Sequence, residues 1–567
     1  MAEEAESPGP PPPPPAASAE IGAERAEAAR RTVPGGAASA VVGAGILLSR
    51  LAGLLRERML ATYFGTSLYA DVFSAGLRMP NVLQNLLGEG TLSASFIPVY
   101  SELLEQGRLK EAGRVAGAVF ALLLAIAAAI SLLGIALAPL LVTLFAPGFE
   151  GERRELTIAV TRLIFPMTGL LVLSAWALGI LNSHRRFFVP YFAPVLWNAA
   201  IITALIVFGT RLELDGLVVA AAWAALIGGL LQFAVQLPWV LRLDRDIRVN
   251  SGRREPGFRE AVRNAGPAIL GRGVVQLSTY VDMILVSLLA VGAPTRLRFA
   301  QTLYVLPISL FGMSVSAAAL PELARQRASE TDVLREQTVA AVRRVAFYIV
   351  PSFVALALLG DVFVAGLYLA GEFAQADVAV VWLTLAAYSV GLVASAGTRV
   401  YQSAFFALRD TKTPARVAGI RVAISALAGA LLMLQFEAVN VGTVTIPAGV
   451  FGGLTVAGLP LGPVGLALGA ALGAWVEWSL LGKRLDRRIG SVAVGAASIA
   501  RMLGAALAAA AAGHGVRIVL GGLHPLPSAL LVAAAFGVVY FAAARALGLS
   551  EARALADAVL RRVRRRR

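Results

Sequence analysis

The chain has 567 residues, of which 57% are hydrophobic and 15% charged, and its mean hydropathy is +0.73. Soluble domains carry about 25% charged residues, and a soluble chain of this composition would expose apolar surface that it cannot bury, so we predict an all-α polytopic membrane protein. The absence of cysteine and the wide separation of the three histidines exclude disulfide scaffolds, thiolate metal sites and cysteine nucleophiles. The sequence contains no P-loop motif, so an internal ATPase is not indicated.

Residues 1–36 differ from the rest of the chain. A proline run from Pro10 to Pro15 lies in a stretch rich in Ala and Glu, which predicts a disordered cytoplasmic arm rather than a signal peptide. From residue 37 onward, apolar stretches have the length of about 20 residues that spans a bilayer core. We predict fourteen spans, near 37–62, 70–98, 112–146, 155–182, 190–209, 215–241, 262–291, 297–321, 339–369, 376–406, 414–436, 460–482, 495–519 and 526–547.

Basic residues are distributed unevenly between the predicted loops. The net charge is +15, and most loop lysines and arginines follow even-numbered spans or lie in the C-terminal tail. The positive-inside rule therefore predicts that both termini are cytoplasmic and that Arg561–Arg567 of the tail contacts anionic lipid headgroups. This topology signal accounts for the positive charge without a nucleic-acid partner.

Two stretches about 220 residues apart resemble each other. Leu77-Arg78 and the segment Gly90–Pro98 correspond to Leu297-Arg298 and the segment Gly312–Pro321. The offset equals six spans, an even number, which predicts two parallel six-helix halves followed by two extra helices. The predicted divisions are an arm at 1–36, halves at 37–241 and 262–482, a basic cytoplasmic loop at 242–261, helices 13 and 14 at 483–547 and a basic tail at 548–567.

Charged residues inside predicted spans are costly and are therefore candidates for function. They concentrate in spans 1 and 2. On a regular helix, the span 2 residues fall on one face and form a polar stripe, which predicts a wet, cationic cavity whose arginines suit phosphate. The alternative interpretation is a structural ion-pair network between spans 1 and 2. The candidate substrate-binding residues are Arg50, Arg56, Glu57, Asp71, Arg78, Asn85 and Glu89.

Other charged residues of the spans give weaker indications. Arg272 of span 7 and Arg399 of span 10 are further candidates for the cavity wall. Asp282 is either a cation ligand or the partner of an arginine. We expect Arg421, Glu477 and Arg501 near span ends, where long side chains reach the interface.

Motifs between Ser49 and Glu102 carry a family resemblance. They comprise Ser49-Arg50-x-x-Gly53-x-x-Arg56, Phe64-Gly65, Ala70-Asp71-x-Phe73, Arg78-Met79-Pro80-Asn81-x-Leu83, Glu89-Gly90 and Ser95-Phe96-x-Pro98, with a second block at Phe405–Pro414. This pattern resembles the MurJ (MviN) family of the multidrug/oligosaccharidyl-lipid/polysaccharide exporter superfamily.

The resemblance implies a lipid II flippase and not an enzyme. Such proteins move the undecaprenyl-diphosphate-linked peptidoglycan precursor across the bacterial cytoplasmic membrane by alternating access, for cell wall synthesis and cell shape. It implies that Arg50, Arg56, Asp71, Arg78 and Glu89 serve the cavity, and that spans 13 and 14 form a groove for the lipid tail. The implied partners are lipid II, membrane lipids and other cell-wall synthesis proteins, and no cofactor is implied.

The sequence departs from the family pattern at several positions. Gln301 and Thr302 stand where some members carry an acidic residue and an arginine in span 8, and Gln84 or Asn85 stands where they carry a second span 2 arginine. An ion site would rest on Asp282 and Ser425, so sodium coupling is in doubt. Na⁺, H⁺ or the membrane potential all stay open as the driving force.

Three alternatives to a lipid II flippase stay open at this point. The nearer one is a drug exporter, or a flippase for another polyprenyl-linked sugar, of the same superfamily. A cation exporter needs an acidic cavity, whereas this one is basic. A membrane glycosyltransferase needs an outer-loop carboxylate, for which Glu150–Glu155 is the only acidic cluster, and a scaffold would use the arm at 1–36.

Overall fold

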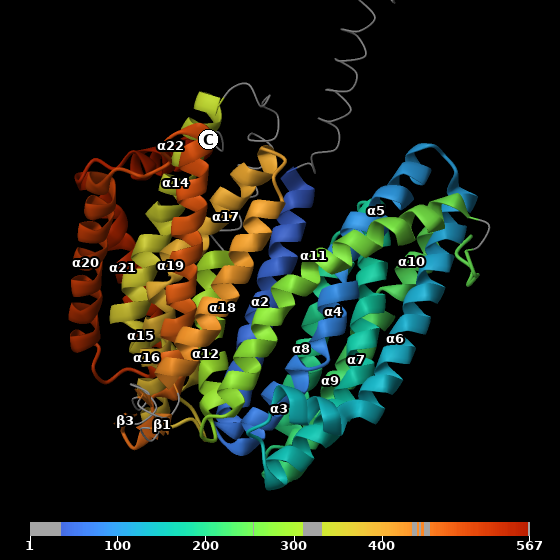
Figure 1. The fold of residues 1–567 in the computed structure, drawn as a ribbon, viewed down its shortest axis with the longest axis horizontal. Coiled ribbons are helices and arrows are strands. Elements are labelled where there is room, and N and C mark those ends of the chain that lie inside the picture. The colour runs from blue at the N-terminus through green and yellow to red at the C-terminus, as the bar shows by residue number, and fades with distance from the viewer. Residues whose placement is uncertain are drawn as a thin grey trace, which may run out of the picture.

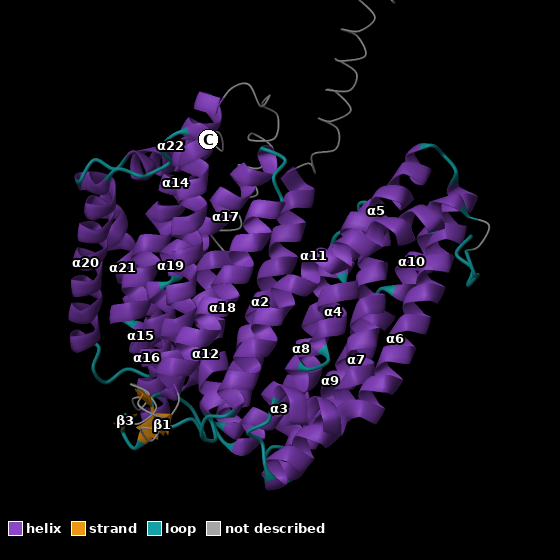
Figure 2. Cartoon of the chain, viewed as in Figure 1, coloured by secondary structure: helices purple, strands orange, loops and turns teal. Residues whose placement is uncertain are grey.

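The computed structural model describes residues 36–252, 255–309, 331–433, 439–441, 444–446 and 454–564 (Figure 1). Helices account for nearly all of the described chain, and two short hairpins are its only sheets (Figure 2). The helices before residue 256 are α2 (Gly36–Phe64), α3 (Leu68–Arg78), α4 (Asn81–Leu87), α5 (Glu89–Glu105), α6 (Leu109–Phe145), α7 (Gly151–Ser183), α8 (Phe188–Phe208), α9 (Leu214–Ala234) and α10 (Leu237–Leu243).

The second part of the chain repeats this pattern of long helices. Its helices are α11 (Pro256–Ser287), α12 (Ala293–Pro307), α14 (Thr331–Leu358), α15 (Gly360–Tyr368), α16 (Gln375–Val390), α17 (Leu392–Ala407), α18 (Lys412–Met433), α19 (Gly462–Ile489), α20 (Ala496–Val519), α21 (Pro525–Ala546) and α22 (Ser550–Arg564). Strands β1 (Val439–Val441) and β2 (Val444–Ile446) pair antiparallel, as do β3 (Thr455–Val456) and β4 (Leu459–Pro460).

The helices form two lobes that meet at one end. Figure 1 shows α3–α10 in one lobe and α12 and α14–α21 in the other, with α2 and α11 between them. The lobes approach each other where α3 and α12 lie, and α22 and the C-terminus lie at the opposite end. Buried side chains form separate clusters in the two lobes, within residues 60–225 and 92–261 of the first and mainly within residues 286–492 of the second.

Ten helical segments are long and apolar enough to cross a membrane, and they coincide with predicted spans 3–6 and 9–14. The chain is therefore a multi-pass helical membrane protein, as predicted, while the total of fourteen spans stays a prediction. Predicted spans 1, 2, 7 and 8 correspond to α2, α3–α5, α11 and α12. These four contain the helices that meet between the lobes, and their intramembrane charges lower their hydropathy.

Predicted span 2 is not one helix. It is divided into α3, α4 and α5, with breaks at Met79-Pro80 and at Gly88. Pro80 lacks the N–H that a continuous helix needs, and Gly88 lies so close to the Gln84 carbonyl oxygen that a β-carbon would clash. The prediction of a single regular stripe along this span was wrong, because helix angles do not carry across two breaks.

The ends of α7 and α17 are built alike. Arg185 and Arg409 both adopt left-handed backbone conformations, with φ of 59° and 57°, which cost non-glycine residues about 1–2 kcal/mol. The amide after each bonds five residues back, Arg186 to the Leu181 carbonyl and Asp410 to the Phe405 carbonyl, as in a Schellman cap. The spacing of 224 residues supports the predicted parallel repeat, whose exact boundaries stay a prediction.

Candidate functional site

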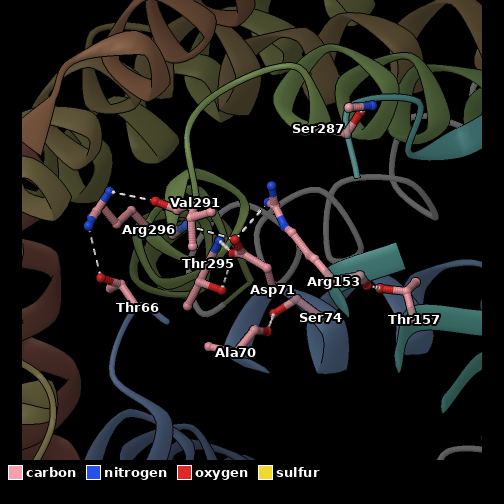
Figure 3. A network of polar contacts seen from close by, with 12 residues as sticks. Thr66, Ala70, Asp71, Ser74, Arg153, Thr157, Ser287, Val291, Thr295 and Arg296 are labelled. Carbon is pink, nitrogen blue, oxygen red and sulfur yellow. Dashed lines mark hydrogen bonds and ion pairs between the residues drawn. The ribbon is translucent and has the colours of Figure 1, made fainter. Parts of the chain in front are cut away.

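Asp71 lies at the centre of a buried network that joins the two lobes (Figure 3). Its side chain is 0% exposed. Oδ2 accepts hydrogen bonds from Arg153 Nη2 and from the Gly292 amide, both at 2.7 Å, and Oδ1 accepts from the Thr295 amide at 3.0 Å and the Thr295 hydroxyl at 2.6 Å. Arg153 belongs to α7 of the first lobe, while Gly292 and Thr295 begin α12 of the second. The carboxylate therefore connects the lobes.

The turn before α12 fits this role of Asp71. Gly292 has a φ of 85°, in the left-handed region that favours glycine. A β-carbon there would overlap the carbonyl oxygen of Thr66. Arg153 is held over the Phe149 ring, with its guanidinium carbon 3.6 Å from the ring centroid. The four hydrogen bonds to Asp71 use both of its oxygens, so it is not open to a ligand in this conformation.

A second set of contacts ties the end of α2 to the second lobe. Asp377 Oδ1 accepts hydrogen bonds from Arg296 Nε at 3.0 Å and from the Thr66 hydroxyl at 2.7 Å, and Thr66 also accepts from Arg296 (Figure 3). Arg58 donates to two backbone carbonyls at the end of α15, at 2.9 and 3.0 Å. Together with Asp71, these contacts hold the lobes together at the end where α3 and α12 meet.

Deeper in the interface, Glu57 bridges two arginines from different lobes. It is 5% exposed and pairs with Arg56 at 2.7 Å and with Arg298 of α12 at 2.6 Å. The guanidinium carbon of Arg56 lies 4.6 Å from the centroid of the Trp197 ring, a distance that allows a cation–π interaction. The predicted pairing between spans 1 and 2 was wrong for Glu57, because its second partner comes from the other lobe.

The two Leu-Arg pairs of the repeat both reach across the interface. Arg298 binds Glu57 of α2, and Arg78 donates to Gln301 Oε1 of α12 at 2.5 Å. Gln301 is fixed in turn, because it donates to the Tyr388 hydroxyl at 2.9 Å. Two arginines in corresponding positions of the halves therefore lie in one layer between the lobes.

Arg50 and Arg399 carry charge that the described residues do not neutralise. Arg50 donates to the Ser309 hydroxyl at 3.0 Å, and within the described ranges neither Arg50 nor Arg399 forms an ion pair with a carboxylate. Arg399 is exposed on α17 and lies within the electrostatic reach of Tyr304, Arg421 and Glu477. Asp282 in turn lies within reach of Arg78 and Arg421.

Arg421 and Glu477 do not lie near span ends, so that expectation was wrong. They form an ion pair of 2.8 Å between α18 and α19, and Glu477 is only 1% exposed. Gln402 also donates to Glu477. An unpaired charge at this depth is expensive, so the two residues compensate each other.

The remaining predicted site residues are placed differently. Glu89 begins α5 and is exposed, and Asn85 is partly exposed on α4. Ser425 packs against the glycine face of α19 at Gly473, and no interaction joins it to Asp282 within the described ranges. Arg272 lies in α11, but its side chain is outside the described residues. The part of the chain that the structure describes holds no group of three or more acidic or histidine residues fit for a metal ion.

Charges at the interface do not balance. Among the described residues, three carboxylates and six arginines lie in or beside the Glu57–Glu477 layer: Glu57, Asp282, Glu477, Arg50, Arg56, Arg78, Arg298, Arg399 and Arg421. Three positive charges are left over inside the membrane-spanning part of the protein. Such an arrangement favours an anionic ligand, since each arginine presents a planar fork of donors.

Sequence reasoning missed Arg153, Thr295, Arg298 and Asp377. Arg298 had a signal, because it is the second member of the repeated Leu-Arg pair. Arg153 was counted as a loop residue of an acidic cluster, although it is buried against Asp71. Thr295 and Asp377 had no signal in sequence spacing, since their partners lie 224 and 311 residues away.

Comparison with known proteins identifies the family. The sequence model described as "Lipid II flippase MurJ" matches residues 60–523, which is most of the chain. The chain belongs to the lipid II flippase MurJ family. This confirms the resemblance found in the motifs between Ser49 and Glu102.

Curated members of the family agree with this assignment. The lipid II flippase MurJ of Burkholderia cenocepacia is 33% identical over 379 residues, covering 66% of this chain and 73% of that protein. A probable lipid II flippase MurJ of Rhizobium tropici is 33% identical over 403 residues, covering 69% and 74%. The family consists of transporters, which agrees with the prediction that the chain is not an enzyme.

Solved structures show the same fold. A structure of lipid II flippase MurJ in an inward closed conformation covers 89% of this chain and 97% of its own, with a TM-score of 0.70 and 21% identity. An inward-facing multidrug resistance MATE transporter of the MOP superfamily covers 78% and 95%, with a TM-score of 0.60 and 20% identity. The likeness to both concerns the fold, and it agrees with the predicted superfamily.

Proposed function

We propose that this protein moves lipid II from the inner to the outer leaflet of the bacterial cytoplasmic membrane. The observation that carries the proposal is the excess of three arginines over carboxylates at the lobe interface. The lipid II headgroup holds a diphosphate and a peptide with carboxylates, so it is anionic and too polar to cross about 30 Å of hydrocarbon unaided. Family membership supports this cargo.

The sidedness of the conformation follows from the topology. Under the positive-inside prediction, both termini are cytoplasmic, and the C-terminal end lies opposite the Asp71 network (Figure 1). The network is then the outer gate, and the structure is closed to the outside. We propose that the headgroup enters from the cytoplasmic side, while the polyprenyl tail stays in the bilayer along α20 and α21, whose apolar side chains are exposed.

The interface residues divide the transport cycle between binding and gating. Arg50 and Arg399 are the arginines without carboxylate partners in the described ranges, so they meet the diphosphate first. Arg56, Arg78 and Arg298 already hold protein partners, and they exchange those partners for phosphate oxygens as the cytoplasmic side closes. Opening of the outer gate then separates Asp71 from Gly292 and Thr295, while Asp71 keeps Arg153 within its own lobe.

The driving force is an ion gradient or the membrane potential. One elementary charge is worth about 2.3 kcal/mol per 100 mV, and a cationic site that moves relative to the membrane couples to that potential. Whether Na⁺ or H⁺ contributes through Asp282 and Ser425 stays a prediction, and so do partners among the cell-wall synthesis proteins.

Complementation tests the proposed cargo. A bacterium depleted of its own lipid II flippase receives the wild-type chain or Arg50→Ala, and lipid II in the outer leaflet is measured directly. We expect wild type to restore outer-leaflet lipid II and the variant to fail at equal membrane abundance. Failure of well-inserted wild type would contradict the cargo, and full rescue by Arg50→Ala would contradict the role of that arginine.

A further inference from the structure

A cavity of about 340 Å³ lies between α14, α17, α19 and the start of α20. This volume is within the range of about 300–1,000 Å³ that is typical of small-ligand sites. Its inner wall is apolar and includes Val345, Ile349, Val393 and Trp478, while Lys483 and Asp486 lie at its other end. A cavity with an apolar interior and charge at one end matches the polarity of an amphiphile.

The cavity is separate from the arginine layer. Gly397 and Tyr401 of α17 line it, whereas Arg399 lies two residues from each, about 200° away on the helix. Trp478 of α19 lines it too, and the adjacent Glu477 pairs with Arg421 at the interface of the lobes. Helices α17 and α19 thus stand between the transport site and this cavity.

Charge at the mouth of the cavity favours an anion. Lys483 is exposed, and within the described ranges it forms no ion pair. Asp486 is partly engaged, because it accepts a hydrogen bond from the Val492 amide at 2.9 Å. A further cation lies close by, since Arg335 Cδ is 3.3 Å from the position of a β-carbon on Gly490.

The location of the mouth corresponds to the lipid headgroup level. Helices α14 and α20 begin there and α19 ends there with Arg487 and Arg488 in its last turn. It is the end of the bundle where α22 lies (Figure 1). Basic pockets between transmembrane helices at this level bind phospholipid headgroups, and a chain that enters from there passes into the apolar wall.

We propose that this cavity binds one bilayer phospholipid, with an acyl chain against Val393 and Trp478 and its phosphate at Lys483. The bound chain fills the gap between α19 and the start of α20. It therefore fastens α20 and α21 to the second lobe. This proposal depends on the membrane fold and not on the identity of the transported lipid.

Photo-crosslinking tests the proposal. A photoreactive residue replaces Val393 in the full chain, which is reconstituted in vesicles of phosphatidylethanolamine and phosphatidylglycerol, irradiated and weighed by mass spectrometry. Ile499 on α20 lines the same cavity and provides a second position should the first variant fail to insert. The control position is Val390, which is exposed and does not line the cavity.

We expect a phospholipid adduct at Val393 or Ile499 that exceeds the adduct at Val390. Lys483→Glu should lower its yield at least about fivefold, since each basic residue near the surface contributes about 1 kcal/mol. Arg416→Glu, on an exposed residue of α18 outside the cavity, should leave it unchanged. Equal adducts at all positions, insensitivity to Lys483→Glu, or displacement of the phospholipid by added lipid II would overturn the proposal.

Discussion

Replacing Asp71 by asparagine tests the outer gate. In the closed conformation three donors from the second lobe, the amides of Gly292 and Thr295 and the Thr295 hydroxyl, bind this carboxylate. Hydrogen bonds to a charged group contribute about 1.5–3 kcal/mol each and those to a neutral group about 0.5–1.5. Loss of charge therefore weakens closure by about 3 kcal/mol, or roughly a hundredfold in the equilibrium between the gate states. Arg153 affects both states alike, because it belongs to the same lobe as Asp71.

Spin-label distances report this shift. Because the chain has no cysteine, Leu212→Cys and Thr455→Cys provide the only two labelling sites, one exposed on each lobe. We expect a population at longer distance in Asp71→Asn that is nearly absent in wild type. Asp361→Asn is the control, since Asp361 pairs with Arg517 inside the second lobe. Identical distance distributions in Asp71→Asn and wild type would refute the gate.

Three further changes probe the interface and one of its loops. Glu57→Gln leaves its two arginine partners unpaired and should lower the free energy of unfolding by about 3 kcal/mol; an unchanged denaturation midpoint would contradict the network. Trp197→Leu removes the ring beside Arg56 and should weaken lipid II binding about fivefold, or about 1 kcal/mol, in a binding titration where unaltered affinity would refute the contact. Thr413 lowers the pKa of Asp410 to about 2, below an unfolded value of about 3.9, so the charged form is stabilising above pH 4 and loses this effect as pH falls through 2. Asp410→Asn should therefore cost about 0.5 kcal/mol at pH 7, and this difference from wild type should vanish in unfolding curves near pH 2; a difference that persists would contradict it.

Features set by local composition were predictable from the sequence. Spans 3–6 and 9–14 were found because a membrane helix must be apolar over about 20 residues wherever it packs. The family followed from closely spaced motifs around Arg50, Asp71 and Arg78. The placement of arginines at the lobe interface was expected on the same basis, since charge inside a membrane needs a partner or water.

Partners across the lobes were not predictable. Helix angles describe one regular helix, whereas span 2 is broken at Pro80 and Gly88. The partners of Asp71 come from α7 and α12, and only the packing of the lobes brings these elements together. A pattern within one helix therefore identified Asp71 as important but assigned it to substrate, whereas its contacts assign it to closure.

Transport by the purified protein tests the central claim most directly. Proteoliposomes that contain only this chain and labelled lipid II are compared with proteoliposomes of Arg50→Ala, and lipid II is counted in each leaflet under an imposed membrane potential. The account predicts that wild type moves lipid II between leaflets and that the variant, reconstituted to the same level, does not. Movement of lipid II at the rate of protein-free vesicles would contradict it.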